Sequence, residues 1–168
     1  ELDAGPLIAQ ATYTPAVDET ATTLLHELSH IGASLASHSL EIIEQEVVNT
    51  RVQESAEITY APKIEPADLV LQWNQSAIAL ERKVRALLDK PLAFTTFRGK
   101  RIQMGRLRIS DQVVDVAPGT LISEGEDLYV ATGSVLVRLT TVKPEGKSWM
   151  DASAWWRGIQ DRENANFT

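Results

Sequence analysis

The first third of the chain has the hydrophobic pattern of a strand followed by helices. Residues 7–13 form a mainly apolar run that predicts a strand. Asp18 is suited to cap a helix, because its side chain can accept hydrogen bonds from free backbone N–H groups. An acidic helical stretch at 40–48 follows. The first helix is indicated by apolar residues at helical spacing: Leu24, Leu28, Ile31 and Leu35. This order is typical of the end of an α/β domain.

The middle of the chain loses this periodicity and then begins a new helix. Residues 58–66 predict an extended linker, because Pro62 biases the residue before it away from helix. Asn74 or Ser76 can cap the next helix, and Lys90-Pro91 ends it. The apolar face of this helix is predicted to hold Leu80, Val84, Leu87 and Leu88.

The remainder of the chain predicts short strands separated by glycine-containing turns. Arg98-Gly99 has the composition of a hairpin turn. Asp151 can cap a final helix at 152–157, which Gly158 ends. The strand-like runs are 92–97, 100–109, 128–132 and 135–142. Several short strands with one helix are typical of a small Greek-key barrel of the OB type.

These patterns predict an α+β chain with three parts. Residues 1–57 are expected to be a partial α/β domain, residues 58–66 a linker, and residues 67–168 an OB-like β-barrel.

Composition excludes several kinds of site. Hydrophobic residues make up 43% of the 168 residues, enough for a packed core. The absence of cysteine excludes disulfides, thiolate nucleophiles and cysteine zinc sites, and it fits a reducing cytosol. No apolar run reaches the roughly 20 residues of a membrane helix, and no signal peptide is visible. We therefore expect a cytoplasmic protein with no membrane partner.

Charge is divided unevenly along the chain. Residues 1–66 carry two basic and eleven acidic side chains, a net charge of −9. Residues 67–168 carry fourteen basic and twelve acidic ones, a net charge of +2. Nine basic residues cluster between Arg82 and Arg108, opposed within that stretch by Asp89 alone. Such a cluster is usually the solvated face of its elements, but it also allows a nucleic-acid partner.

Residues 26–30 spell H-E-x-x-H, the motif with which zinc proteases hold Zn²⁺ through two histidines. At 3.6 residues per turn, both His26 and His30 lie far around the helix from its apolar stripe. We therefore expect them to face solvent. Ala36 stands where the longer metzincin pattern has its third histidine. A zinc protease is the least favoured alternative, and no metal site is expected.

Asp3 is the residue with the strongest catalytic claim. It lies in a tight acidic turn, Glu1-Leu2-Asp3-Ala4-Gly5-Pro6. Spacing alone favours an ordinary turn aspartate before Gly-Pro. However, Leu2-Asp3-Ala4-Gly5 matches the Leu-Asp-x-Gly motif of folate-dependent formyltransferases, which this segment resembles.

The resemblance continues along almost the whole chain and is to the methionyl-tRNA formyltransferase family. The linker matches that family's Tyr-Ala-x-Lys-Ile pattern as Tyr60-Ala61-Pro62-Lys63-Ile64. Gln72 is a departure, because the family usually has an acid before this tryptophan. Other matching segments are 71–77, 130–133 and 143–147, followed by Met150.

The resemblance implies transfer of a formyl group from 10-formyltetrahydrofolate to the amino group of methionine on initiator tRNA. It makes residues 1–57 the C-terminal remnant of a Rossmann-like formyltransferase domain, with Asp3 beside the formyl carbon. The asparagine and histidine that act with such an aspartate belong to an upstream region. We therefore expect this portion alone to be inactive and to lack most of the folate pocket. We also expect a monomer.

The resemblance assigns tRNA binding to the linker and the barrel. The alternation of residues 106–109 places Arg106 and Arg108 on one strand face. The predicted tRNA-binding residues are Lys63, Arg82, Arg85, Lys100, Arg101, Arg106 and Arg108. The four tryptophans are expected to pack in the core rather than to stack on bases: Trp73, Trp149, Trp155 and Trp156. Two alternatives stay open, a sugar N-formyltransferase of the same fold and a non-catalytic RNA-binding barrel.

Overall fold

The computed structural model describes residues 3–54, 58–89 and 91–168, and the chain divides into two compact units. The first unit is Glu1–Lys63 and the second is Ile64–Thr168. Leu2, the predicted domain boundary at 57 and the predicted helix end at Lys90 lie outside the described residues.

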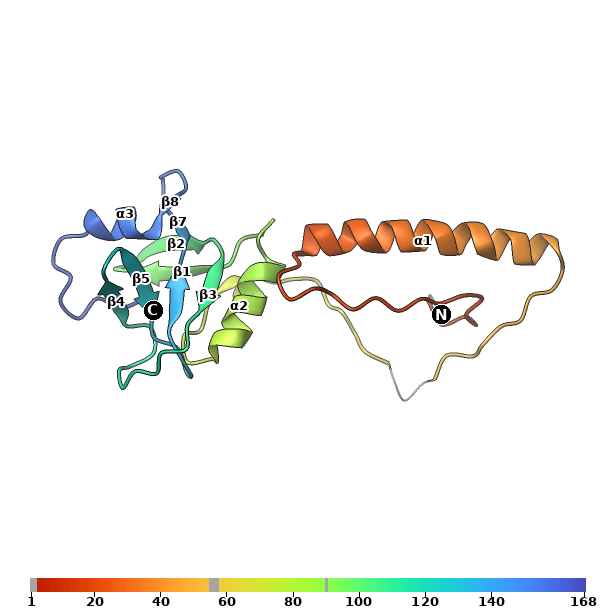
Figure 1. Ribbon diagram of the computed structural model, residues 1–168, viewed down its shortest axis with the longest axis horizontal. Coiled ribbons are helices and arrows are strands. Elements are labelled where there is room, and N and C mark those ends of the chain that lie inside the picture. The colour runs from red at the N-terminus through yellow and green to blue at the C-terminus, as the bar shows by residue number, and fades with distance from the viewer. Residues whose placement is uncertain (1–2, 55–57, 90) are drawn as a thin grey trace. The chain divides into compact units, whose positions relative to one another are not determined.

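Among its described residues, the first unit contains one long helix, α1 (Ala21–Glu44), and not two (Figure 1). The predicted second helix at 40–48 is wrong, because no proline interrupts the helical hydrogen bonds before Glu44. The predicted cap is also displaced: Thr20, not Asp18, caps the helix in a reciprocal pair with Thr23.

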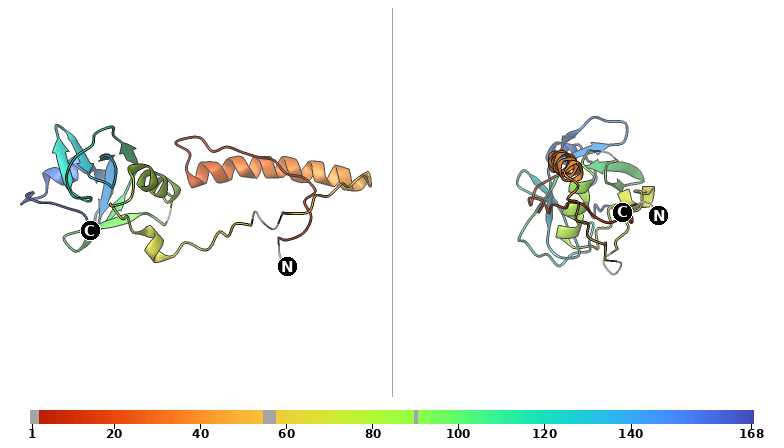
Figure 2. Two further views of the ribbon diagram at one scale, coloured as in Figure 1. Left: turned by 90° about the horizontal axis from the view of Figure 1, so that it is seen from below. Right: turned by 90° about the vertical axis from the view of Figure 1, so that its right-hand side faces the viewer.

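The predicted strand at 7–13 does not form. Leu7 alone pairs with Arg51 in an antiparallel bridge, with N···O distances of 2.8 and 2.9 Å in the two directions. The rest of the segment is extended and runs along α1 (Figures 1 and 2). A strand needs a neighbouring strand for its backbone groups, and the described part of this unit offers no such neighbour. None of its described residues is buried.

The second unit begins with a short 3-10 helix, η2 (Pro66–Leu69), and then α2 (Ala77–Ala86). Ser76 is the N-cap of α2 and accepts from the Ala79 N–H, so one of the two predicted caps is confirmed. The predicted apolar face of α2 is also confirmed, because Leu80 and Val84 are fully buried.

In the part of the chain that the structure describes, eight strands form two antiparallel four-stranded sheets. The first sheet has the order β1 (Phe94–Phe97), β2 (Lys100–Met104), β7 (Thr141–Pro144), β8 (Met150–Asp151). The second has the order β3 (Leu107–Ile109), β6 (Val137–Leu139), β5 (Asp127–Val130), β4 (Leu121–Glu124). The final helix, α3 (Ala152–Arg157), has the predicted bounds and ends at Gly158, but the side chain of Asp151 makes no capping hydrogen bond.

Two predicted strands are each divided between the sheets. The run 100–109 breaks at Gly105-Arg106, so that β2 and β3 belong to different sheets. The run 135–142 breaks at Thr140 in the same way. A Cβ on Gly105 would overlap the side chain of Thr141, so the two crossings pack closely. The α+β class is confirmed, whereas neither sheet of the described residues closes on itself as a barrel.

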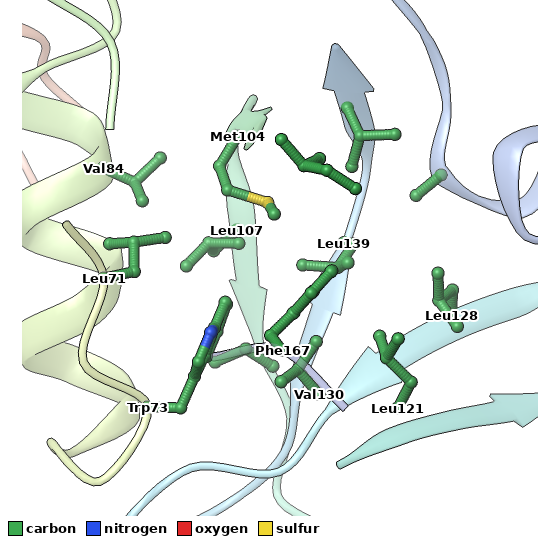
Figure 3. Packing of buried hydrophobic residues seen from close by; sticks show 14 of the residues in the cluster. Leu71, Trp73, Val84, Met104, Leu107, Leu121, Leu128, Val130, Leu139 and Phe167 are labelled. Atoms are coloured by element: carbon green, nitrogen blue, oxygen red, sulfur yellow. The ribbon is translucent and has the colours of Figure 1, made fainter. Parts of the chain in front are cut away.

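One hydrophobic core lies within the second unit (Figure 3). Trp73 stacks on Phe167 with ring centroids 5.5 Å apart, and its indole N–H donates to the buried Thr95 hydroxyl at 2.9 Å. Trp155 and Trp156 are also buried, as predicted. The prediction for Trp149 is wrong, because this side chain is 43% exposed.

Among the described residues, no helix combines the length and the apolar character needed to span a membrane.

Candidate functional site

The turn that contains Asp3 is held by a residue fifty positions away. Asp3 has a positive φ of 58° and is exposed. The side-chain amide of Gln53 donates to the carbonyl oxygens of Asp3 and Gly5, at 2.9 and 2.8 Å. Those two bonds match the two hydrogens of the amide, so the amide is fully used as a clamp on the turn. The carboxylate of Asp3 is left facing solvent.

Gln53 and Arg51 hold the segment that carries Asp3, and the sequence pattern did not predict this role. Arg51 pairs through its backbone with Leu7, and its side chain donates to Gln10. Together the two residues fix the segment that carries Asp3 against the chain after α1. These contacts link distant residues and follow no periodicity, so no local signal could have indicated them.

The H-E-x-x-H residues lie in the exposed part of α1. The Nε2 atoms of His26 and His30 are 3.4 Å apart, and His26 Nδ1 is 3.7 Å from a Glu27 carboxylate oxygen. Both histidines face solvent, as predicted. No group of three or more potential metal ligands lies together among the residues that the structure describes.

Two of the predicted tRNA-binding arginines lie on α2. Arg82 is exposed. Arg85 is mostly covered and pairs with Glu81, with Nε 3.0 Å from a carboxylate oxygen, so much of its charge is compensated within the helix. The neighbouring Lys83 donates to the Val70 carbonyl at 2.9 Å, which ties α2 to the chain before it.

The predicted residues Lys100 and Arg101 lie on the first sheet. Both are exposed. The Arg101 guanidinium lies over the Phe94 ring, 3.4 Å from its centroid, which fixes its long side chain on the outer face. Lys143, on the neighbouring strand β7, pairs with Gln103 on β2, and Gln103 pairs in turn with Phe94 on β1. Lys143 was not among the predicted binding residues.

Arg108 lies on the outer face of the second sheet. It pairs across β3 and β6 with Arg138, which in turn pairs with Tyr129 on β5. Arg138 binds both carboxylate oxygens of Asp127, at 3.0 and 3.1 Å, and this ion pair compensates its charge. Arg108 is therefore the more available cation of the two. The sequence Val137-Arg138-Leu139 already alternates, so Arg138 could have been included from its pattern.

Arg106 lies where the chain passes from the first sheet to the second. Thr140 is at the return crossing, and its hydroxyl donates to the Arg106 carbonyl at 2.7 Å. The two crossings and the end of the β7–β8 hairpin line an open hollow of about 370 Å³. Its lining residues are Leu88, Gly105, Arg106, Thr140, Thr141 and Trp149.

The predicted basic residues therefore fall into four groups. Arg106 lies at the crossing between the two sheets. Arg82 and Arg85 lie on α2, which packs against β3 with Arg108. Lys100 and Arg101 lie on the first sheet. Lys63 is exposed and is the last residue of the first unit.

Comparison with known proteins assigns the chain to a family. The model of the formyl transferase C-terminal domain matches residues 63–160. This match covers more than half of the chain, which therefore belongs to that family.

Curated relatives extend the similarity to both units. The chain is 35% identical over 162 residues to a methionyl-tRNA formyltransferase of Corynebacterium jeikeium, covering 95% of this chain and 50% of the relative. It is 36% identical over 166 residues to one of Pseudarthrobacter chlorophenolicus, covering 99% of this chain and 54% of the relative. The chain thus spans about half the length of these relatives. The predicted resemblance to methionyl-tRNA formyltransferases is confirmed.

Solved structures have a similar fold. HypX from Aquifex aeolicus, crystallised with tetrahydrofolic acid, superposes with a TM-score of 0.64 at 21% identity. The match covers 94% of this chain and 28% of HypX.

Proposed function

We propose that this chain is the C-terminal portion of a methionyl-tRNA formyltransferase. The complete protein would move the formyl group of 10-formyltetrahydrofolate to the amino group of methionine on initiator tRNA, in the cytoplasm and as a monomer. The observation that carries the proposal is continuous similarity to proteins of that name, which spans 99% of this chain in one of them. That similarity includes both the Asp3 turn and the basic strands.

Asp3 is proposed to be the catalytic carboxylate. When an amine attacks a formyl group, a proton must leave the nitrogen and the developing oxyanion needs hydrogen-bond donors. A carboxylate beside a histidine can keep that histidine protonated, so that the histidine donates to the oxyanion. The Gln53 clamp would hold the Asp3 backbone while leaving its carboxylate accessible.

The described residues fit a minor share of a folate site. Asp3 is exposed, and its turn is held by backbone contacts to Gln53 rather than by the walls of a cavity. We propose that the folate pocket and the oxyanion donors come chiefly from the rest of the longer protein. The apolar stripe of α1, half-buried at Leu24, Ile31 and Leu35, would pack against the same region.

The second unit is proposed to bind tRNA as an OB-like barrel made from the two sheets. The sheets are joined at the crossings, where the Gly105 N–H donates to the Thr141 carbonyl at 2.9 Å. The proposed phosphate contacts are the residues predicted from sequence: Lys63, Arg82, Arg85, Lys100, Arg101, Arg106 and Arg108. Exposed guanidinium groups on strand faces suit phosphates, and each phosphate contact adds to the salt dependence of binding.

Formylation by the full-length protein that contains this chain tests the proposal. The protein should formylate initiator methionyl-tRNA in the presence of 10-formyltetrahydrofolate, and this 168-residue chain alone should not. Amino sugars offered in place of the tRNA should not be formylated. Formylation of a sugar but not of the tRNA would favour the sugar N-formyltransferase. Tight tRNA binding without formyl transfer would favour a non-catalytic RNA-binding protein.

A further inference from the structure

Trp149 differs from the other three tryptophans of this chain. Trp73, Trp155 and Trp156 are 5–7% exposed and belong to the core, whereas Trp149 is 43% exposed at the end of the β7–β8 hairpin. An indole is the largest apolar side chain, and leaving it in solvent gives up burial that would stabilise the fold. Neither the core nor the ion pairs of the second unit explain its position.

The hollow beside Trp149 has a rigid polar floor. Three hydrogen bonds fix it: the Gly105 N–H to the Thr141 carbonyl at 2.9 Å, the Thr140 hydroxyl to the Arg106 carbonyl at 2.7 Å, and the Ala152 N–H to the Thr140 carbonyl at 3.0 Å. The Cβ position of Gly105 is already filled by Thr141. The hollow is therefore formed before any ligand binds.

The charged side chains around the hollow include more cations than carboxylates, since Asp151 is paired with Thr141 across β7 and β8 and the cations are Arg106, Arg108 and Lys143. Arg106 lines the hollow, and Arg108 follows two residues later on β3. Lys143 lies two residues beyond Thr141 along β7, and so on the same face of that strand. An apolar protein segment would gain little from threonine hydroxyls and guanidinium groups, whereas a ligand with a flat ring and a phosphate would use both.

We propose that this hollow binds one unpaired nucleotide of the RNA substrate, with the base stacked on Trp149 and a phosphate beside Arg106. The inference rests on the proposed function, because it specifies which feature of the tRNA the second unit holds. The hollow, at about 370 Å³, lies at the small end of ligand sites and fits a single nucleotide. The base must be unpaired, because both faces of a base inside a duplex are already stacked.

Binding of two RNA probes by the 168-residue chain tests this site. The probes are a short single-stranded RNA oligonucleotide and an RNA duplex of equal phosphate number, titrated against wild type, Trp149→Ala and Trp149→Phe. Base–aromatic stacking predicts about ten-fold weaker single-strand binding for Trp149→Ala. Trp149→Phe keeps a ring and should lose much less. Ile78→Ala is the matched control, because Ile78 is also half-exposed, on α2. The control should bind both probes as wild type does.

Duplex binding and fluorescence separate stacking from a general loss of structure. Duplex affinity and the salt slope should be unchanged in Trp149→Ala, because no phosphate contact is removed. The fluorescence lost in Trp149→Phe reports Trp149, and single-stranded RNA should quench that component in wild type. Equal weakening of both probes, or unchanged single-strand affinity without quenching, overturns the site.

Tests of the site and of the proposed function can fail separately. If the protein formylates methionyl-tRNA normally but its Trp149→Ala variant binds the single strand like wild type, the stacking site is refuted and the proposed function stands. If the wild-type chain binds neither probe and the full-length protein does not formylate the tRNA, both the stacking site and the proposed function are refuted.

Discussion

The buried hydrogen bond between Trp73 and Thr95 provides a direct test of how the second unit is held together. The Trp73 indole N–H donates to the Thr95 hydroxyl at 2.9 Å, and that hydroxyl donates to the Thr168 carbonyl at 3.2 Å. Thr95 is 0% exposed, so water cannot replace the hydroxyl. Thr95→Val keeps the shape and the branching of the side chain but removes both bonds.

The expected cost follows from the buried donor that this variant leaves behind. An unsatisfied buried polar group costs about 1–3 kcal/mol, and for a domain of this size each kcal/mol lowers the melting temperature by about 4–8 °C. Thr95→Ser is the matched control, because it keeps the hydroxyl and removes one methyl group. It should lose no more than about 1 kcal/mol.

Urea unfolding followed by tryptophan fluorescence measures this cost for the second unit specifically, because all four tryptophans lie in it. A cycle with Trp73→Phe isolates the bond, and we expect a coupling of about 1–2 kcal/mol. A Thr95→Val protein within about 0.3 kcal/mol of wild type, or Thr95→Ser as unstable as Thr95→Val, would show that this hydrogen bond does not stabilise the second unit.

Three further predictions address other parts of the chain. Gly105→Ala should lower the free energy of unfolding by about 1–3 kcal/mol, because the added methyl group overlaps Thr141; unchanged urea unfolding would contradict the close packing of the sheet crossings. Gln53→Ala in the full-length protein should lower kcat for formyl transfer about ten-fold without changing KM for tRNA, because the turn that carries Asp3 loses its clamp. Gln53→Glu has a carboxylate that cannot donate to these carbonyls, so its kcat should be equally low. Hydrogen bonding to the Glu19 carboxylate raises the pKa of Tyr13 above its ordinary 10.0. The contribution of this hydrogen bond to stability is therefore present below about pH 10 and is lost as the pH rises through the higher pKa of the folded protein. Difference absorbance titration against Tyr13→Phe measures the pKa of Tyr13, and a midpoint at or below 10.0 would contradict the shift.

Features set by neighbouring residues could be predicted from the sequence. The Ser76 cap depends on backbone groups within one helical turn. The hairpin at Arg98-Gly99 depends on two residues that take positive φ, 50° and 75°. The ion pair of Arg85 with Glu81 follows the four-residue spacing of helical partners. Each of these is stabilised by contacts that the local sequence already contains.

Features set by distant partners could not be predicted. Residues 7–13 have the pattern of a strand, but a strand forms only beside another strand, and pattern says nothing about its neighbour. The run 100–109 alternates almost without a break, so its sequence does not show that Gly105 takes the chain from one sheet to the other. The exposure of Trp149 depends on the end of a hairpin and contradicts the usual preference of tryptophan for the core.

The candidate site was predicted by residue identity more than by geometry. Asp3 and the arginines of the strands were proposed from motif and alternation, whereas the Gln53 clamp links positions fifty residues apart. The charge compensation of Arg138 by Asp127 likewise depends on the register of β5 and β6. Which cations remain available to a ligand is therefore a property of the fold.

Single-turnover formylation of methionyl-tRNA by the full-length protein tests whether Asp3 acts in formyl transfer. Asp3→Asn removes the charge while keeping the size of the side chain and the carbonyl that Gln53 binds. The rate should fall about 10²–10⁴-fold, the usual contribution of a positioned acid-base group. Thermal unfolding of the variant should be unchanged, because the side chain is exposed. A near-normal rate in a folded Asp3→Asn protein would make Asp3 a turn residue with no part in the reaction.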